Sequence, residues 1–364
     1  MKVLSLIDSF KGTLSSLTLG KIMTETLQKR NIEASYIPIS DGGEGFLDVI
    51  SFIKNVKRIN CSINDPLARL IKSYYVVDND TAYIEMAESS GLGLLKDDEK
   101  NPFLTSTYGL GELINDAFNK GYKKIIVGIG GSATNDGGAG MLEALGVKFY
   151  NQNSEIKGLC NLKLKDIKSI DASELYNKIK DINVTVLSDV INPLLGIKGA
   201  TYVYSLQKGA KSNDLPLLEE NMASYAKIVS QSIGFDASLY QGSGAAGGVG
   251  FAFHSFFKPT FVSGINYLLD LIDFNNLDVD VIITGEGKID YQSLDGKVIS
   301  GILKRVKNNQ KVIGVCAIKE IEEIPNMKIY AIVDEVATVN ESLLHPIETY
   351  KKLCEKVCID LMRD

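Results

Sequence analysis

The sequence predicts an α/β protein whose sheets are covered by helices on both faces. Short runs of β-branched and other apolar residues alternate along the chain with segments of helical periodicity, and this alternation is typical of βαβ units. Most of the runs lack the alternating polar residues of a half-solvated sheet, which indicates buried and mainly parallel strands. The runs are residues 3–7, 34–39, 74–77, 82–86, 124–129, 184–187, 281–284, 312–316 and 329–333.

Apolar residues at intervals of three and four define the clearest helices. One helix should end before Gly121 and another before Gly234, because glycine commonly follows the last turn of a helix. Pro346 suits the first turn of a C-terminal helix. The apolar stripes are Leu110, Leu113, Ile114, Ala117 and Phe118, then Leu218, Met222, Tyr225, Val229 and Ile233, and finally Ile347, Tyr350, Leu353, Cys354, Val357 and Leu361.

Length and charge exclude several classes of protein. The 364 residues favour two domains, and a discontinuous arrangement fits because no Pro/Ser-rich linker or charge tract separates them. With 39 Lys+Arg against 45 Asp+Glu and no dense basic block, we expect no nucleic-acid or membrane partner. The five cysteines are scattered and form no Cys-x-x-Cys pair, so we expect neither a disulfide framework nor a zinc site.

Two apolar stretches bear on localisation. The run at residues 3–7 is broken by Asp8 before it could form the core of a signal peptide. Residues 237–257 are uncharged but contain five glycines and three serines, together with Tyr240, Gln241 and His254, so we interpret them as a buried or ligand-binding segment and not as a membrane span. We therefore expect a cytoplasmic protein.

Polar, glycine-rich segments follow several predicted strands, which is where ligands bind in α/β proteins. After residues 3–7 comes Asp8-Ser9-Phe10-Lys11-Gly12-Thr13, which leads into a Ser/Thr-rich helix start. The N–H groups and dipole of a helix N-terminus, with the charge of Lys11 beside them, favour a carboxylate or phosphate. A simple helix cap with a solvated lysine explains this segment equally well.

The second segment, Ser40-Asp41-Gly42-Gly43-Glu44-Gly45, opens another predicted helix. Its paired glycines let the backbone approach a ligand, while the carboxylates of Asp41 and Glu44 could contact a metal ion or a hydroxyl group. An ordinary turn is the alternative, because Asp-Gly-Gly recurs at residues 136–138.

The third segment, residues 128–140, allows two interpretations. Gly128, Gly130 and Ala133 satisfy the dinucleotide-binding fingerprint, which would indicate a nicotinamide-dependent oxidoreductase. That fingerprint needs an acidic residue after the next strand, whereas the nearest candidate, Glu155, lies in a polar stretch. Side-chain donors within the segment favour a phosphate-binding loop instead. They are Ser132, Thr134 and Asn135.

Two further candidates lie in the middle of the chain. Asp189 follows the strand predicted at residues 184–187 and is a candidate base or magnesium ligand, although an aspartate that caps the next turn is the alternative. Lys208 lies in the turn Gln207-Lys208-Gly209-Ala210. The run at residues 242–250 has few side chains, which indicates close approach by a ligand or tight helix packing.

The charges after the strand at residues 281–284 are the most informative. Gly285-Glu286-Gly287-Lys288-Ile289-Asp290 is followed by Gln292-Ser293 and Gly296-Lys297. Two carboxylates, two lysines and several glycines after one buried strand suit a magnesium-bound polyphosphate.

Together these segments resemble the signature blocks of the type I glycerate kinase family, in the family's order. The blocks are residues 8–12, 41–45, 130–140, 189–194, 207–210, 244–248 and 285–290, with smaller ones at 85–87 and 107–109. The sequence departs from the family pattern at Ile7, where proline is usual, at Lys288, where arginine is common, and at Cys160-Asn161, which replace small residues. We expect these departures to affect substrate preference at most.

The resemblance implies an enzyme that uses ATP and Mg²⁺ to phosphorylate a hydroxyl of glycerate, with 2-phosphoglycerate favoured. It implies a discontinuous Rossmann-like domain with a mainly parallel sheet, residues 1–62 plus 262–364, and an inserted α/β domain, residues 63–261. The active site is then expected in the cleft between the two domains. The resemblance is also compatible with a homodimer.

We expect the site residues to divide by role. No Walker A sequence occurs, so other glycine-rich loops and lysines must hold the phosphates. As catalytic residues we expect Lys11, Asp189 and Asp8, with Asp189 deprotonating the substrate hydroxyl. The other expected contacts are Ser9, Asp41, Glu44 and Asn192 to substrate; Gly130, Gly131, Ser132, Asn135, Lys208, Gly285, Gly287 and Lys288 to ATP; and Glu286 and Asp290 to magnesium.

Three alternatives stay open. A kinase for another short hydroxy acid or polyol would differ only in its acceptor. A nicotinamide oxidoreductase would bind NAD. A non-catalytic relative would bind nucleotide without turnover.

Overall fold

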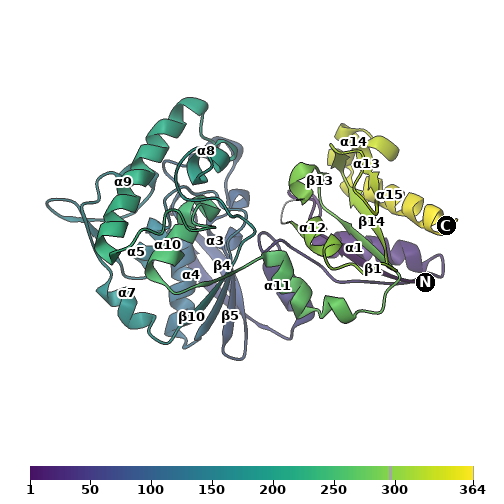
Figure 1. Ribbon diagram of the computed structural model, residues 1–364, viewed down its shortest axis with the longest axis horizontal. Coiled ribbons are helices and arrows are strands. Elements are labelled where there is room, and N and C mark those ends of the chain that lie inside the picture. The colour runs from purple at the N-terminus through teal and green to yellow at the C-terminus, as the bar shows by residue number, and fades with distance from the viewer. Residues whose placement is uncertain (295–296, 364) are drawn as a thin grey trace. The chain divides into compact units, whose positions relative to one another are not determined.

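The computed structural model describes residues 1–294 and 297–363 (Figure 1). The chain forms two compact units. The first comprises Met1–Asp41, Asp48–Lys54 and Ser263–Asp364, and the second comprises Gly42–Leu47 and Asn55–Val262. Each unit has its own sheet and its own hydrophobic core, so both are α/β as the sequence predicts.

The first unit is built on a five-stranded parallel sheet, which confirms the predicted Rossmann-like character. Its order, β16-β14-β12-β1-β2, places β1 beside β12, with Ile7 opposite Gly285 at their carboxyl ends. All residues of β12 are buried, as expected for a central strand covered on both faces. The strands are β1 (Lys2–Ile7), β2 (Glu33–Tyr36), β12 (Val281–Gly285), β14 (Lys311–Cys316) and β16 (Met327–Ala331), with a two-stranded pair formed by β13 (Lys288–Ile289) and β15 (Ile318–Lys319).

Apolar side chains leave both faces of this sheet. In β14, Ile313 and Val315 belong to the core shared with α1 (Ser16–Gln28) and α15 (Pro346–Leu361). Val312 and Cys316 belong to a smaller cluster shared with α12 (Val298–Leu303). This two-residue alternation is what a strand with two buried faces requires. The helices are α1 (Ser16–Gln28), α2 (Phe46–Ile53), which continues from the second unit, α11 (Gly264–Leu271), α12 (Val298–Leu303), α13 (Ile332–Glu335), α14 (Val339–Leu344) and α15 (Pro346–Leu361), with 3-10 turns at Phe274–Asn276 and Tyr291–Leu294.

The second unit has a mixed six-stranded sheet in the order β11-β10-β6-β5-β4-β3. Strands β11, β10, β6 and β5 are parallel, whereas β4 and β3 extend the sheet as an antiparallel hairpin. The strands are β3 (Lys57–Asn64), β4 (Leu70–Asp78), β5 (Thr81–Glu85), β6 (Lys124–Gly128), β10 (Asn183–Leu187) and β11 (Thr260–Val262); a three-stranded sheet contains β7 (Lys148–Tyr150), β8 (Glu155–Ile156) and β9 (Ser169–Asp171).

Sequence reasoning did not predict β3, an edge strand whose polar side chains alternate with few apolar ones. The domain boundary expected between residues 62 and 63 falls inside this strand, which pairs along its whole length with β4. The helices of the second unit are α3 (Ala87–Ser90), α4 (Tyr108–Asn119), α5 (Ala139–Ala144), α6 (Asn161–Leu164), α7 (Ser173–Lys178), α8 (Ala200–Tyr204), α9 (Leu215–Ile233) and α10 (Val249–Phe256); 3-10 turns lie at Leu92–Leu94, Asp97–Glu99, Leu206–Lys208, Ser212–Asp214 and Ala245–Gly248.

The predicted strands and helices are present. Each apolar run overlaps a strand, and α9 ends immediately before Gly234, whose φ of 84° is the left-handed conformation expected after a helix. The helix α15 begins at Pro346. No helix in the described part of the chain is long and apolar enough to cross a membrane.

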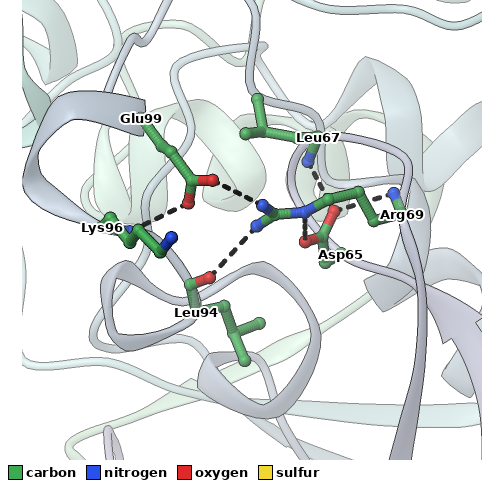
Figure 2. A network of polar contacts seen from close by, with 6 residues as sticks. All are labelled: Asp65, Leu67, Arg69, Leu94, Lys96 and Glu99. Atoms are coloured by element: carbon green, nitrogen blue, oxygen red, sulfur yellow. Dashed lines mark hydrogen bonds and ion pairs between the residues drawn. The ribbon is translucent and has the colours of Figure 1, made fainter.

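A polar network fixes the turn between β3 and β4 in the second unit (Figure 2). The carboxylate of Asp65 is 2% exposed and accepts hydrogen bonds from the N–H groups of Leu67 and Arg69 and from Arg69 Nε. The same guanidinium donates to Glu99 at 2.6 Å and to the carbonyl oxygen of Leu94 at 3.3 Å. Arg69 thus connects the hairpin turn to the segment that precedes α4.

We expect Arg69→Met to lower the free energy of unfolding by about 1–3 kcal/mol, because the buried Asp65 carboxylate loses its charged partner. Urea unfolding followed by circular dichroism measures this. The matched control is Arg58→Met, whose exposed guanidinium lies over the ring of Tyr74 on the same hairpin and should cost at most about 1 kcal/mol. Equal losses in the two variants would contradict a special role for Arg69.

Candidate active site

Parallel pairing brings two of the predicted segments to one edge of the sheet in the first unit. Because β1 and β12 are neighbours in parallel register, the chain leaves both strands at the same edge. The Asp8 N–H donates to the Gly285 carbonyl at 2.8 Å, which extends the pairing by one residue. The segments that begin with Asp8 and Glu286 are therefore adjacent.

A cluster of charged side chains occupies this edge. The Lys11 ammonium lies 3.8 Å from the Asp41 carboxylate, and Lys297 lies 3.8 Å from Glu286. Burial, followed by the negative charges of Asp41 and Glu286, raises the pKa of Asp8 well above its ordinary value, while Lys11 opposes that shift. Burial also raises the pKa of Glu286. The edge thus holds carboxylates that resist ionisation beside two lysines.

Some oxygen atoms at this edge are buried without a hydrogen-bond partner among the described residues. They include Glu286 Oε1 and Ser9 Oγ. No group of three or more His, Cys, Asp and Glu side chains suited to a metal ion occurs within residues 1–294 and 297–363. A site with a carboxylate oxygen that is unpaired within these described ranges, that of Glu286, fits Mg²⁺. This ion typically takes one or two protein carboxylates and completes its shell with phosphate oxygens and water.

Other residues at this edge also contact their neighbours within the first unit. The Lys288 ammonium lies 2.8 Å from Glu320 and 3.6 Å from Asp290, so the lysine is engaged by two carboxylates. A Cβ on Gly285 would lie 1.9 Å from the Val315 carbonyl oxygen, so strand pairing alone requires glycine there. Helix α1 begins at Ser16, and the hydroxyl of Ser15 caps its first turn by accepting a hydrogen bond from the Thr18 N–H at 3.2 Å. Lys11 therefore precedes the helix and does not sit at its first turn.

In the second unit, the loop after β6 presents backbone donors at its tip. The N–H groups of Gly130, Gly131 and Ser132 donate to no atom of the described residues. Gly131 is exposed and has a φ of 75°, which favours glycine. Unpaired N–H groups in such a turn form a concavity that binds anions.

Lys208 lies beneath this loop. Its side chain is 3% exposed, and its ammonium group donates to Ser132 Oγ at 2.9 Å and to the Thr134 carbonyl at 2.7 Å. Burial lowers the pKa of Lys208 to about 7, and the nearby charge of Asp136 opposes the shift. The sequence places Lys208 in a turn, but only the structure shows that it is buried against the loop.

Asp136 begins the turn into α5. One carboxylate oxygen accepts from the N–H and hydroxyl of Thr107 and from the Gly140 N–H, and the other accepts from the Gly138 N–H. The residue thus ties the start of α4 to the start of α5. Burial raises its pKa, and these hydrogen bonds oppose that shift. The Asp-Gly-Gly sequence at residues 136–138 is therefore turn and cap chemistry.

The remaining candidates of the second unit lie on three segments. Asp189 is half-buried beyond the end of β10. The Asn192 side chain donates to the Lys198 carbonyl at 2.7 Å and accepts from the Tyr204 hydroxyl at 2.8 Å, so its amide is already engaged. Glu44 is exposed.

A buried carboxylate supports the loop that carries Glu44. Glu85, at the end of β5, accepts hydrogen bonds from the N–H groups of Gly45 and Leu47, each at 3.0 Å. These bonds satisfy backbone donors at the start of α2.

Residues 3–362 match the model of the "Glycerate kinase family". The chain belongs to this family. Its relatives include glycerate kinases from Bacillus cereus, 40% identical over 84% of this chain and 82% of the relative, and from Bacillus subtilis, 37% identical over 86% and 84%. Glycerate 2-kinase from Escherichia coli is 36% identical over 86% of this chain and 84% of its own length.

A solved structure of the glycerate kinase family has the same fold. The crystal structure of putative glycerate kinase 2 from Salmonella typhimurium LT2 aligns with a TM-score of 0.78 and 31% identity, over 100% of this chain and 98% of that chain. The packing of Gly128 bears on the dinucleotide-binding interpretation of this loop. A Cβ there would lie 2.2 Å from the Gly42 carbonyl oxygen, so its glycine serves packing and is no evidence for a dinucleotide.

Within this glycerate kinase family member, the predicted residues fall into two sets. The first unit carries Asp8, Ser9, Lys11, Asp41, Gly285, Glu286, Gly287, Lys288 and Asp290, and the second carries Glu44, Gly130, Gly131, Ser132, Asn135, Asp189, Asn192 and Lys208. Residues expected to bind ATP occur in both sets. Sequence reasoning assigned no supporting role to Glu85, because a single polar residue at the end of an apolar strand carries no local signal. Lys297 was counted from the sequence among the charges suited to a polyphosphate, and the structure places it beside Glu286.

Lys208 should make stability depend on pH. The ordinary pKa is 10.5, so between about pH 7 and 10.5 the unfolded chain keeps a proton that the folded protein has released. The free energy of unfolding should therefore rise with pH in this window, by at most about 1.4 kcal/mol per unit. Lys208→Met removes the titrating group, so its stability should fall further behind the wild type at pH 9 than at pH 7 in urea titrations. Parallel pH dependences would show that Lys208 titrates normally.

Proposed function

We propose that this protein transfers the γ-phosphoryl group of ATP to a hydroxyl of glycerate and releases phosphoglycerate and ADP, with the 2-hydroxyl favoured as acceptor. The observation that carries the proposal is family membership over residues 3–362 in a chain that keeps both charged sets. The lysines and carboxylates of the first unit suit an acidic substrate, and the loop tip of the second unit suits phosphate.

ATP would bind through backbone donors and a few side chains. In the second unit these are the N–H groups of Gly130 and Gly131, the hydroxyl of Ser132, the amide of Asn135 and the amine of Lys208. In the first unit, Gly285, Gly287 and Lys288 would complete the set. Binding by several weak donors in place of a Walker A loop is consistent with the absence of that sequence.

Glycerate carries a carboxylate, and Lys11 would supply the positive charge that pairs with it. The Lys11 side chain is 60% exposed, and its ammonium lies 3.8 Å from the Asp41 carboxylate. Ser9, whose hydroxyl is buried without a partner among the described residues, would donate to the substrate, with Asp41, Glu44 and Asn192 as further contacts. A short acid would thus be recognised by charge and by hydroxyl contacts together.

Phosphoryl transfer requires a base and charge neutralisation. Asp189 would accept the proton of the attacking hydroxyl, and Lys11 would neutralise charge on the transferring group, with Asp8 beside it. Glu286 and Asp290 would hold Mg²⁺, which when bound supplies positive charge to the polyphosphate. The proposal requires the residues of the two units to act on one bound pair of reactants.

The reaction is tested by phosphorus NMR of D-glycerate, ATP and Mg²⁺ incubated with the protein. We expect ADP and a new phosphomonoester resonance. In the proton-coupled spectrum a phosphoryl group on the 2-hydroxyl gives a doublet, because its carbon bears one hydrogen, whereas one on the 3-hydroxyl gives a triplet. No ester with glycerate, but an ester with another short hydroxy acid or polyol, would reassign the substrate. No ester with any acceptor would reject the kinase.

Asp189→Asn tests the base. We expect kcat to fall about 10²- to 10⁴-fold, the usual contribution of a general base, while KM for ATP changes by less than about threefold. A coupled ADP-release assay measures both constants. The control is Asp166→Asn, an exposed aspartate of the same unit, which should retain activity. Preserved turnover in Asp189→Asn would remove Asp189 from this role.

A further inference from the structure

Three successive backbone carbonyls of the loop after β6 are each bound by a different buried side chain. Thr105 Oγ1 donates to the carbonyl of Ala133 at 2.9 Å, Lys208 Nζ to that of Thr134 at 2.7 Å, and Asn161 Nδ2 to that of Asn135 at 3.0 Å. The three donors come from segments far apart in the sequence. They act on adjacent peptide groups directly after the loop tip, Gly130 to Ser132.

Two of the donors have no assigned role so far. Thr105 and Asn161 are both fully buried, and most buried polar groups serve a hydrogen bond. The orientation of the Asn161 amide is defined by its partners: its nitrogen donates to two carbonyls, those of Asn135 and Leu218, and its oxygen accepts from the Asn221 amide. Asn161 therefore joins the loop to α9, the longest helix of the second unit.

These bonds restrict the loop beyond the atoms that they touch. A peptide group is planar, so fixing the direction of a carbonyl also fixes the N–H of the following residue. The three fixed planes join residues 133 to 136, so they leave the chain little freedom at Thr134 and Asn135, directly after the loop tip. The tip itself contains two glycines, which would lose much conformational entropy on binding a ligand if they were not held in place.

The region beneath the tip also retains buried polar atoms that make no hydrogen bond to the described residues, Thr134 Oγ1 and Asn135 Oδ1 among them. Burying a polar atom without a hydrogen-bond partner destabilises the folded protein. A segment selected for stability alone would not keep these costs, so its conformation is better explained by what the tip binds.

We propose that Thr105 and Asn161 are positioning residues of the nucleotide site: together with Lys208 they hold the base of the loop so that the N–H groups of Gly130, Gly131 and Ser132 are preorganised for the phosphates of ATP. This inference rests on the proposed function. Neither residue touches the nucleotide. Their loss therefore weakens nucleotide binding and leaves the contacts to the acceptor unchanged.

The test uses the full chain with Thr105→Val, which removes the hydroxyl without changing the shape of the side chain. Thr105→Ser keeps the donor, and Asn161→Leu removes the second one. The matched control is Thr24→Val in α1, a buried threonine whose hydroxyl has no partner among the described residues. Affinity for Mg²⁺-ADP is measured by titration calorimetry, and KM for ATP and for glycerate by the ADP-release assay.

We expect Thr105→Val to raise the Kd for ADP and the KM for ATP about three- to tenfold, the equivalent of one hydrogen bond, with KM for glycerate changed less than twofold. Asn161→Leu should have the same selective effect, while Thr105→Ser and Thr24→Val should resemble the wild type. Equal changes for ATP and glycerate, no change in Thr105→Val, or a loss in Thr105→Ser would overturn the proposal. ADP titration needs no turnover, so a wild type that binds ADP but does not phosphorylate glycerate would reject the proposed function and still leave this inference measurable.

Discussion

The parallel pairing of β1 with β12 is the constraint on which the charged edge of the first unit depends. It places the residues after Ile7 beside those after Gly285, so that segments separated by more than two hundred positions in the sequence share one sheet edge. Burial raises the pKa of Asp8 at this edge, and the negative charges of Asp41 and Glu286 add to the shift. Lys11 and Lys297 lie beside the carboxylates of Asp41 and Glu286 and supply positive charge at this edge.

In the second unit, burial shifts the pKa of a lysine at the loop after β6. Lys208 lies beneath the loop, and burial lowers its pKa to about 7. A neutral amine has two hydrogens, which is enough for both of its hydrogen bonds, to Ser132 Oγ and to the Thr134 carbonyl. The loop can therefore be held whether or not Lys208 carries a proton. Close packing explains the few side chains at residues 242–250. A Cβ on Gly247 would lie 1.9 Å from the Thr134 carbonyl oxygen, and a Cβ on Gly250 would lie 1.9 Å from the Gly242 carbonyl oxygen.

Much of the fold can be predicted from the sequence because it has strong local signals. The central strands are uninterrupted apolar runs, and Gly234 and Pro346 mark helix ends through their own backbone preferences. The edge strand β3 escaped prediction because half of its side chains face solvent, so its sequence resembles a polar loop. Its partner β4 was predicted from the apolar run at residues 74–77, most of which is buried.

Part of the candidate site can likewise be predicted from the sequence, and part cannot. Glycine-rich segments after strands are visible in the sequence, and they are the basis of the predicted binding site. The residues that hold those segments, such as Thr105 and Asn161, are single polar side chains whose partners lie far away along the chain, so no spacing or periodicity reveals them. For Asp-Gly-Gly at residues 136–138 the sequence indicates an ordinary turn, and only the four hydrogen bonds of Asp136 identify it as a cap for two helices.

The central claim of this account is that ATP and glycerate are held by these two sets of residues. The most direct measurement is a crystal structure with a non-hydrolysable ATP analogue, Mg²⁺ and D-glycerate. The account predicts phosphate oxygens within hydrogen-bond distance of the N–H groups of Gly130 and Gly131 and the glycerate carboxylate beside Lys11. Nucleotide bound away from the loop after β6, or glycerate bound away from Lys11, would contradict it.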